Sequence, residues 1–238
     1  MGKQDTEKLE DNLNGTAAVS PVDALVIVQT DCLEMLRGLP DKCCDIFTDP
    51  PYNVGKNYGE GIDDNLSDGE YLAWITEVLE EAKRVSNVLT VYTPHNWQEK
   101  YWGILGPEFK QVVLWHPAKN GFYKNLVNKT AILLTNAEPT KDEQVENIWK
   151  VQLPGIGYYS KEPKNDHVGY TTLDVTRKAI ERLCKSELIV DPFMGSGTTA
   201  IAAEMAGRKW FGSELNPKTI QKASKRIAEF RRQPTFAL

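Results

Sequence analysis

The sequence predicts an α/β protein: a single domain built on a doubly wound, mostly parallel sheet of seven strands. Short apolar segments rich in β-branched residues alternate with segments of helical periodicity, the pattern of parallel strands joined by crossover helices. The 238 residues are 41% hydrophobic and 26% charged, which suits one large α/β domain. Ligands of such sheets bind at the carboxyl ends of strands, so function is expected in the loops that follow the strands.

The first half of the chain contains five of these strands. The segment ALVIVQ at residues 24–29 is expected to be a buried strand, and leucines at helical spacing then mark a short helix that Pro40 ends. Ser67-Asp68-Gly69-Glu70 is a capping-box pattern, which starts a helix that runs to about Arg84 with one apolar stripe. The same criteria predict strands at 44–48, 88–92, 111–115 and 131–135, and a helix at 96–105.

The second half repeats the alternation after a polar interruption. Residues 136–170 lack apolar periodicity and are expected to form an insert, the kind of segment where specificity is usually located. Asn216 as N-cap begins a final helix. Residues 1–20 are expected to be a flexible tail ahead of a domain at 21–238. Strands are predicted at 188–190 and 209–212, and helices at 172–183, 200–205 and 216–231.

Charge, cysteine spacing and hydropathy narrow the function classes. The net charge of −5 argues against nucleic-acid binding through global charge, so any nucleic-acid footprint must be a local patch. The four cysteines contain no C-x-x-C pair and the three histidines are scattered, which predicts reduced thiols in a cytoplasmic protein and no metal site. No apolar run approaches a membrane span and residues 1–20 do not resemble a signal peptide, so no membrane partner is expected.

The stretch Thr48-Asp49-Pro50-Pro51-Tyr52-Asn53 follows a predicted buried strand. Its two prolines fix φ and remove two backbone N–H donors, which gives a stiff turn whose carbonyls are expected to point outward unpaired. The Asp49 carboxylate, the Pro50 carbonyl and the Tyr52 ring suit a planar ring that bears an exocyclic amine. The amine can donate two hydrogen bonds while the tyrosine covers the ring. Alone, these letters are also compatible with a plain turn.

A second stretch is a strand, a glycine-rich turn and a helix start. Asp191-Pro192-Phe193-Met194-Gly195-Ser196-Gly197-Thr198-Thr199 lets the backbone come close to a ligand, and the free N–H groups of the helix start favour an anion. The next strand ends at Glu214, an acidic residue placed to bind a ribose diol. The glycine spacing differs from that of the dinucleotide fingerprint, so a nicotinamide cofactor is weakly indicated.

Together the two motifs resemble those of the S-adenosylmethionine-dependent DNA amino-methyltransferases, which modify adenine N6 or cytosine N4. D-P-P-Y resembles their catalytic motif and D-P-F-M-G-S-G-T-T their cofactor motif, in the order of the β-type members. The resemblance spans about Val26–Arg231 and implies a Rossmann-like methyltransferase fold. It implies catalytic roles for Asp49, Pro50, Pro51 and Tyr52, and cofactor contacts from Asp31, Cys32, Asp49, Asp191, Phe193, Gly195, Gly197, Thr198 and Glu214.

Within the cofactor set, the resemblance assigns Asp31 to the adenine amine of the cofactor and Glu214 to its ribose hydroxyls. One departure concerns the methionine end. Where the family often carries H-P-T-Q-K-P, residues 167–172 read H-V-G-Y-T-T, which keeps the histidine but lacks the lysine. The cofactor carboxylate is then expected on backbone groups and on the hydroxyls of Thr171, Thr172 or Thr198.

A basic and aromatic segment is the candidate for nucleic-acid contacts. Residues 109–137 contain no acidic residue, and lysines are interleaved there with aromatic side chains. Such a segment suits phosphate contacts combined with base stacking, although a solvated loop with a few core aromatics has the same composition. The expected nucleic-acid contacts are Tyr52, Asn53, Trp115, Lys119, Phe122, Tyr123 and Lys124.

The expected function is methyl transfer to the N6 amine of adenine in a specific DNA sequence, after the base has been flipped out of the duplex. Asp at the first motif position is usual for adenine N6, whereas Ser is usual for cytosine N4. The alternatives are a cytosine N4 enzyme, an RNA adenine methyltransferase, a catalytically silent nucleic-acid-binding subunit, and a glutamine methylase, whose motif begins with Asn. The resemblance also suggests a homodimer, a bacterial or phage origin and a restriction–modification context.

Overall fold

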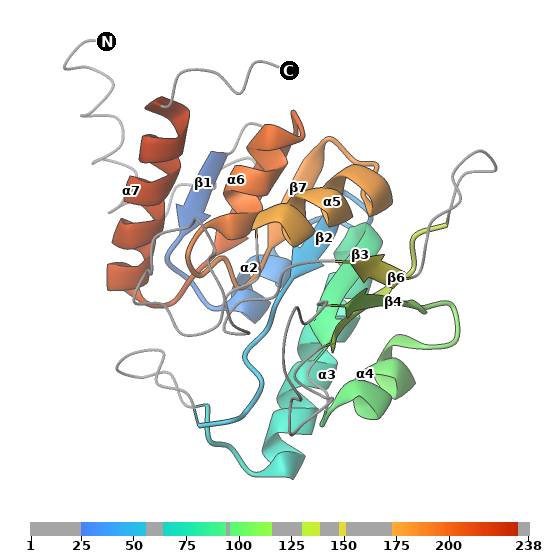
Figure 1. Cartoon of the computed structure of the whole chain (residues 1–238). Coiled ribbons are helices and arrows are strands. Elements are labelled where there is room, and N and C mark those ends of the chain that lie inside the picture. The colour runs from blue at the N-terminus through green and yellow to red at the C-terminus, as the bar shows by residue number, and fades with distance from the viewer. Residues whose placement is uncertain are drawn as a thin grey trace, which may run out of the picture.

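Residues 25–55, 64–93, 96–115, 130–138, 148–150 and 173–232 are described by the structure, a computed structural model (Figure 1). They contain one eight-stranded sheet in the order β1-β8-β7-β2-β3-β5-β4-β6. The strands are β1 (Leu25–Val28), β2 (Cys44–Thr48), β3 (Ser86–Thr93), β4 (Lys110–Trp115), β5 (Thr130–Thr135), β6 (Ile148–Lys150), β7 (Leu188–Asp191) and β8 (Lys209–Ser213). The helices are α2 (Cys32–Arg37), α3 (Asp68–Val85), α4 (Gln98–Leu105), α5 (Leu173–Leu183), α6 (Thr198–Met205) and α7 (Pro217–Arg232).

The sheet confirms the predicted fold class. The pairs β1–β8, β8–β7, β7–β2, β2–β3 and β4–β6 are parallel, while β5 runs antiparallel to both β3 and β4. All seven predicted strands are present within two residues of their expected ends. The predicted strand count is corrected by β6, which lies inside the segment 136–170 where no regular element was expected. Three residues are too few to show a period, so its sequence could not reveal it.

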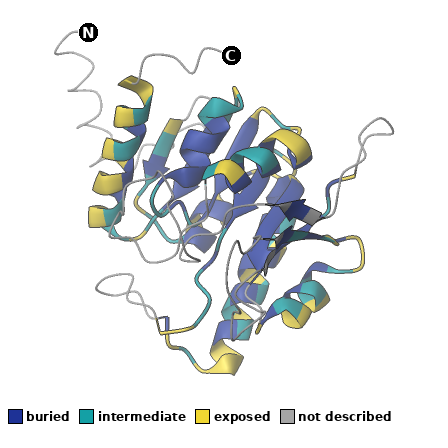
Figure 2. Cartoon of the chain, viewed as in Figure 1, coloured by how far each residue is buried: buried dark blue, intermediate teal, exposed yellow. Residues whose placement is uncertain are grey.

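Helices cover both faces of the sheet, as a doubly wound fold requires. Successive strand residues point to opposite faces, and in β2 this directs Ile46 into one hydrophobic core and Phe47 into the other. The first core also contains the buried apolar residues of α2, α3 and α4, and the second those of α5, α6 and α7. Figure 2 shows buried strands between helices whose outer sides are exposed.

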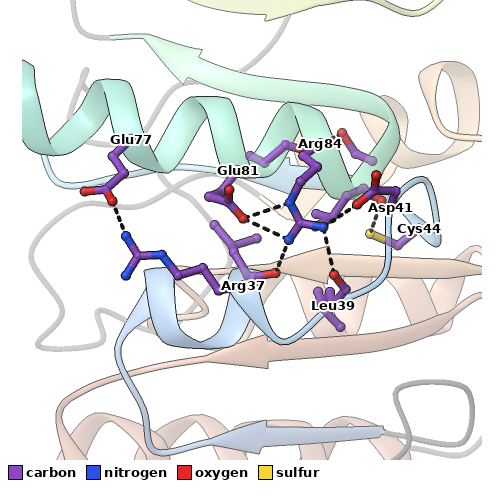
Figure 3. A network of polar contacts seen from close by, with 11 residues as sticks. Arg37, Leu39, Asp41, Cys44, Glu77, Glu81 and Arg84 are labelled. Carbon is purple, nitrogen blue, oxygen red and sulfur yellow. Dashed lines mark hydrogen bonds and ion pairs between the residues drawn. The ribbon is translucent and has the colours of Figure 1, made fainter.

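An arginine of α3 joins α3 to α2, on the face of the sheet that these two helices cover together with α4 (Figure 3). The Arg84 guanidinium donates to the backbone carbonyls of Leu36 and Leu39, each at 3.0 Å, where α2 ends. It also pairs with the carboxylates of Asp41 and Glu81. These bonds fix the end of α2 and therefore the start of the segment that leads into β2.

Two predicted segments fall outside the described residues. The tail at 1–20 lies wholly outside them and the insert at 136–170 lies mostly outside, so both stay predictions, as does the domain boundary at residue 21. Among the helices that the structure describes, none is long and apolar enough to cross a membrane.

Candidate active site

The two sequence motifs meet at one edge of the sheet. β2 and β7 are neighbouring parallel strands, with Ile46 paired to Val190. The motif loops leave the carboxyl ends of these strands, so they open at the same edge. A side-chain hydrogen bond joins the two strand ends directly, because Thr48 Oγ1 donates to Asp191 Oδ1 over 2.8 Å.

Asp191 is the buried carboxylate on which the two loops converge. It is 3% exposed, and it also accepts from the Thr199 hydroxyl at 2.6 Å and from Phe193 N at 3.0 Å. Burial raises the pKa of Asp191 to about 6, with a smaller contribution from the charge of Asp49. The carboxylate is bonded to three protein groups, so its cofactor contact stays a prediction.

The loop of residues 49–52, called the DPPY loop below, is held by donors from other elements. Tyr71 Oη donates to the Pro51 carbonyl at 3.0 Å, and Trp97 Nε1 donates to the Tyr52 carbonyl at 3.2 Å. The expectation of unpaired carbonyls is therefore wrong for these two residues, because aromatic side chains of α3 and of the α4 N-terminus reach them. The Pro50 carbonyl receives no hydrogen bond from a described residue.

Asp49 and Tyr52 contact each other within the DPPY loop. The Tyr52 hydroxyl donates to Asp49 Oδ1. Burial and the Asp49 carboxylate raise the pKa of Tyr52 well above its usual value, so the phenol stays protonated and remains a donor. An aromatic ring is thereby held beside an acceptor carboxylate, the pair that the predicted substrate contact requires.

Asn53 fastens the end of the DPPY loop to the segment before α3. Its φ of 54° is in the left-handed region, which asparagine tolerates better than most residues. Its side-chain amide exchanges two hydrogen bonds with the backbone of Leu66, at 2.9 and 2.8 Å, and Asp64 accepts from its backbone N–H at 2.8 Å. Asn53 therefore positions the loop in this structure, and its contact with nucleic acid stays a prediction.

Residues 193–198, called the glycine turn below, need a backbone that side chains resist. Gly195 and Gly197 have φ of 49° and 78°. Gly195 N donates to Glu214 Oε2 at 3.1 Å, and Asn216 N donates to Glu214 Oε1 at 2.9 Å. Burial raises the pKa of Glu214. Glu214 thus joins the glycine turn to the start of α7.

Asp31 lies after β1, which is the neighbour of β8 in the sheet. Its Oδ1 caps α2 by accepting from Leu33 N at 2.8 Å. Cys32 Sγ lies 4.0 Å from Oδ2, and burial raises the pKa of this thiol to about 12. Asp31 and Cys32 therefore lie at the predicted edge, with the thiol protonated at neutral pH.

Acidic residues follow the carboxyl ends of three strands near the glycine turn. Asp31 follows β1, Asp49 follows β2 and Glu214 follows β8. In the described parts of the chain, no three His, Cys, Asp or Glu side chains gather in a way that could hold a metal ion. The site thus offers carboxylate and carbonyl acceptors to a ligand that carries positive charge or amine N–H groups.

A profile of the N6/N4 methyltransferase family, described as DNA methylase, matches residues 45–90 and 110–225. These stretches are more than half of the chain and include both motifs. The chain belongs to this family. Comparison with individual relatives and solved structures gives the sequence identity and the share of each chain that is similar.

Type II methyltransferase M.BamHI of Bacillus amyloliquefaciens is 28% identical over 226 residues, which are 78% of this chain and 53% of that protein. The chain thus spans about half the length of this relative. DNA adenine methyltransferase YhdJ of Escherichia coli (strain K12) is 24% identical over 250 residues, 86% of this chain and 83% of that protein. The structure of PvuII DNA methyltransferase (cytosine-N4-specific) has the same fold, with a TM-score of 0.60 and 18% identity over 86% of this chain and 90% of that chain.

The predicted nucleic-acid side of the site lies largely outside the described residues. Trp115 ends β4, but its side chain is not described. Residues 167–172, with the threonines expected near the cofactor carboxylate, are also outside. The contacts predicted for these residues stay predictions. The same holds for Lys119, Phe122, Tyr123 and Lys124.

Four residues that contact the two motifs had no assigned role from sequence. Thr48 bonds to Asp191, Asp64 accepts from Asn53 N, and Tyr71 and Trp97 donate to carbonyls of the DPPY loop, whereas Tyr101 bonds to Tyr71 and to no residue of the loop. Tyr71 lies on the apolar stripe predicted for α3. That stripe indicates burial of the ring, but it carries no information on what the hydroxyl contacts.

Proposed function

We propose that the protein methylates the N6 amine of adenine in a specific DNA sequence, with S-adenosylmethionine as methyl donor. Membership of the family supports the more general activity, which is DNA amino-methylation by an N6/N4 enzyme. The observation that supports the site is the Thr48–Asp191 hydrogen bond, which brings the DPPY loop and the glycine turn to one edge. An amine acceptor and a cofactor cradle are then neighbours.

The residues around the glycine turn fit S-adenosylmethionine. This ligand carries a positive sulfonium and a positive ammonium group, which the neighbouring carboxylates Asp31, Asp49 and Glu214 suit electrostatically. The missing Cβ of Gly195 leaves its backbone open to a ligand, since the nearest atom that a Cβ would meet is the Phe193 carbonyl oxygen at 3.7 Å. The space beside Gly197 is filled by Ile227 of α7, so its cofactor contact stays a prediction. When bound, this cofactor supplies an electrophilic methyl group.

The chain's own residues hold and orient the substrate amine. Asp49 and the Pro50 carbonyl accept its two N–H groups, which favours a more tetrahedral nitrogen with an available lone pair. The amine takes the place of the Tyr52 hydroxyl on Asp49 Oδ1, and the Tyr52 ring stacks on the flipped base. Catalysis by these residues is therefore positioning, together with stabilisation of the positive charge that develops on the nitrogen.

Replacement of Asp49 tests this assignment. Asp49→Ala is expected to lower the methyl-transfer rate by about 100-fold or more, the size of effect that follows loss of a charge-stabilising group. Cofactor affinity, measured by calorimetry, is expected to stay largely intact and to fall far less than the rate, because Asp31 and Glu214 remain. The rate is measured as transfer of labelled methyl from S-adenosylmethionine to mixed DNA, with Asp49→Asn as the isosteric variant. Equal losses of cofactor binding and turnover would mean that Asp49 mainly holds the cofactor.

The choice of adenine rests on Asp49 as the first motif residue, and a relative named as an adenine methyltransferase supports it. Cytosine N4 is the second candidate, because a cytosine-N4-specific methyltransferase has the same fold. Mass spectrometry of nucleosides from methylated DNA distinguishes the two products. A parallel reaction with RNA tests the RNA alternative.

A catalytically silent DNA-binding subunit is the alternative outside enzymes. Retention of Asp31, Gly195 and Glu214 at the same edge argues against it, and a titration with S-adenosylmethionine tests it directly. DNA is the partner that the proposed activity requires. A homodimer, a cytoplasmic location and a bacterial or phage origin stay predictions.

A further inference from the structure

Two residues of the DPPY loop have no backbone hydrogen-bond donor that could hold the loop in place. Pro50 and Pro51 have no N–H group, so the loop depends on donors that reach its carbonyls. Two side chains supply them: Tyr71 Oη bonds to the Pro51 carbonyl at 3.0 Å and Trp97 Nε1 to the Tyr52 carbonyl at 3.2 Å. The position of the loop is therefore set partly from α3 and the N-terminus of α4.

The direction of the hydrogen bonds behind the loop follows from counting protons. Tyr71 and Tyr101 have their hydroxyl oxygens 2.7 Å apart, and either could donate. The Pro51 carbonyl has no proton, so Tyr71 must give its single proton to that carbonyl. Tyr101 must then donate to Tyr71. Burial raises the pKa of Tyr71 to about 12 and that of Tyr101 well above its usual value, so both protons are present at neutral pH.

The two tyrosines are both buried but not equivalent. Tyr71 is 2% exposed and Tyr101 is 0% exposed. The Tyr71 ring packs against the ring of Trp97, with centroids 5.0 Å apart, and against that of Trp74, with centroids 5.9 Å apart. Trp74 in turn meets Phe193 of the glycine turn edge-on at 5.8 Å. Tyr71 thus contacts the DPPY loop through its hydroxyl and, through Trp74, is packed toward the glycine turn.

We propose that Tyr71 is a positioning residue for methyl transfer, which acts by holding the Pro51 carbonyl and so aiming the adjacent Pro50 carbonyl and Asp49 at the substrate amine. The inference rests on the proposed function. Because the proline rings fix φ, a shift at Pro51 is passed to its neighbours rather than absorbed. A misplacement of about 1 Å at a reacting centre can cost about 100-fold in rate.

Two single substitutions separate this role from simple packing. Tyr71→Phe removes the donor to Pro51, whereas Tyr101→Phe removes a hydroxyl from the same buried pair and leaves that donor intact. We expect Tyr71→Phe to lower kcat at least about 10-fold, with KM for S-adenosylmethionine little changed. Tyr101→Phe is expected to keep kcat within about twofold. Hydrogen exchange at the Asn53 and Val54 amides is expected to quicken in Tyr71→Phe only.

The double variant Tyr71→Phe, Tyr101→Phe covers the case in which Tyr71→Phe is too unstable to assay. It leaves no orphaned hydroxyl, so its stability is expected to recover toward that of the wild type. The proposal requires kcat to stay low in the double variant, and recovery of kcat together with stability would overturn it. Equal kcat in the two single variants would overturn it as well. A wild-type chain that transfers no methyl group to any DNA would overturn the proposed function itself.

Discussion

At the scale of single residues, the polar side chains at the two motifs already form hydrogen bonds with other groups of the protein. Glu214 binds two backbone N–H groups, Asp191 binds two hydroxyls and one N–H group, and Asn53 pairs with Leu66. Loops that are already ordered lose less conformational freedom when a ligand binds. The motif residues therefore preorganise the site as well as offering contacts to a ligand.

Asp191 makes stability depend on pH. Its pKa of about 6 in the folded protein exceeds the ordinary value of 3.8, because burial disfavours the charged form. Between these two values the folded chain keeps a proton that the unfolded chain has released. The contribution of Asp191 to the free energy of unfolding therefore falls as pH rises through this window, by about 3 kcal/mol in all.

Asp191→Asn removes this titration while it keeps an acceptor oxygen. We expect the free energy of unfolding of the wild type, relative to that of Asp191→Asn, to fall between about pH 4 and pH 6. Urea titrations at several pH values measure both proteins. A difference that does not change with pH would contradict the prediction.

At the scale of elements, α2 and α3 are joined by two arginines of different character (Figure 3). Arg84 binds the carbonyl of Leu36, in the last turn of α2, and that of Leu39, which follows the helix, where a cation also suits the helix dipole. Arg37 forms an ion pair with Glu77 in which both side chains are about half exposed, at 55% and 51%. The first contact satisfies backbone groups, whereas the second is screened by water.

Arg84→Met and Arg37→Met form a matched pair. Arg84→Met is expected to lower the free energy of unfolding by about 1 to 3 kcal/mol, because several hydrogen bonds from one charged group are lost. Arg37→Met is expected to cost about 0 to 1 kcal/mol. Thermal and urea unfolding measure the difference. If the two variants were equally destabilised, the contact with the end of α2 would not be the stabilising one.

At the scale of the whole molecule, β2 carries one carboxylate near each end. Asp49 follows its carboxyl end at the candidate site. Asp45, near the amino end, is 0% exposed and accepts from Val88 N at 3.0 Å, from Ser186 N at 2.6 Å and from the Ser186 hydroxyl at 2.8 Å. It also accepts from Lys185 N, so it joins β2 to β3 and to the turn before β7.

Asp45→Ala is expected to destabilise the fold by about 3 to 5 kcal/mol, because several buried donors lose one shared acceptor. Ser186→Ala is the matched control, and it removes one of the hydrogen bonds to Asp45, together with a longer one from Asn87 Nδ2 at 3.3 Å, at a cost of about 1 kcal/mol. Urea unfolding measures both variants. Turnover per folded molecule is expected to stay unchanged in Asp45→Ala, unlike in Asp49→Ala. A stable but inactive Asp45 variant would show that this end of β2 serves the reaction.

Much of the architecture was predictable because burial imposes local periods. The seven predicted strands, the capping box at Ser67 and the N-cap at Asn216 are all found, since each depends on neighbours in sequence. β6 escaped prediction because three residues contain no period. The donor role of Tyr71 escaped prediction because an apolar stripe reports only that a side chain is buried.

By itself the sequence determined the α/β class and the residues of both motifs, since these are written in local spacing and residue type. Only the tertiary structure decided that Thr48 meets Asp191, 143 residues away, and that Tyr71 meets the Pro51 carbonyl, 20 residues away. Such contacts depend on which strands become neighbours and on how α3 packs against the sheet. That choice is made by the burial of all the apolar faces together, so no single stretch of the chain contains it.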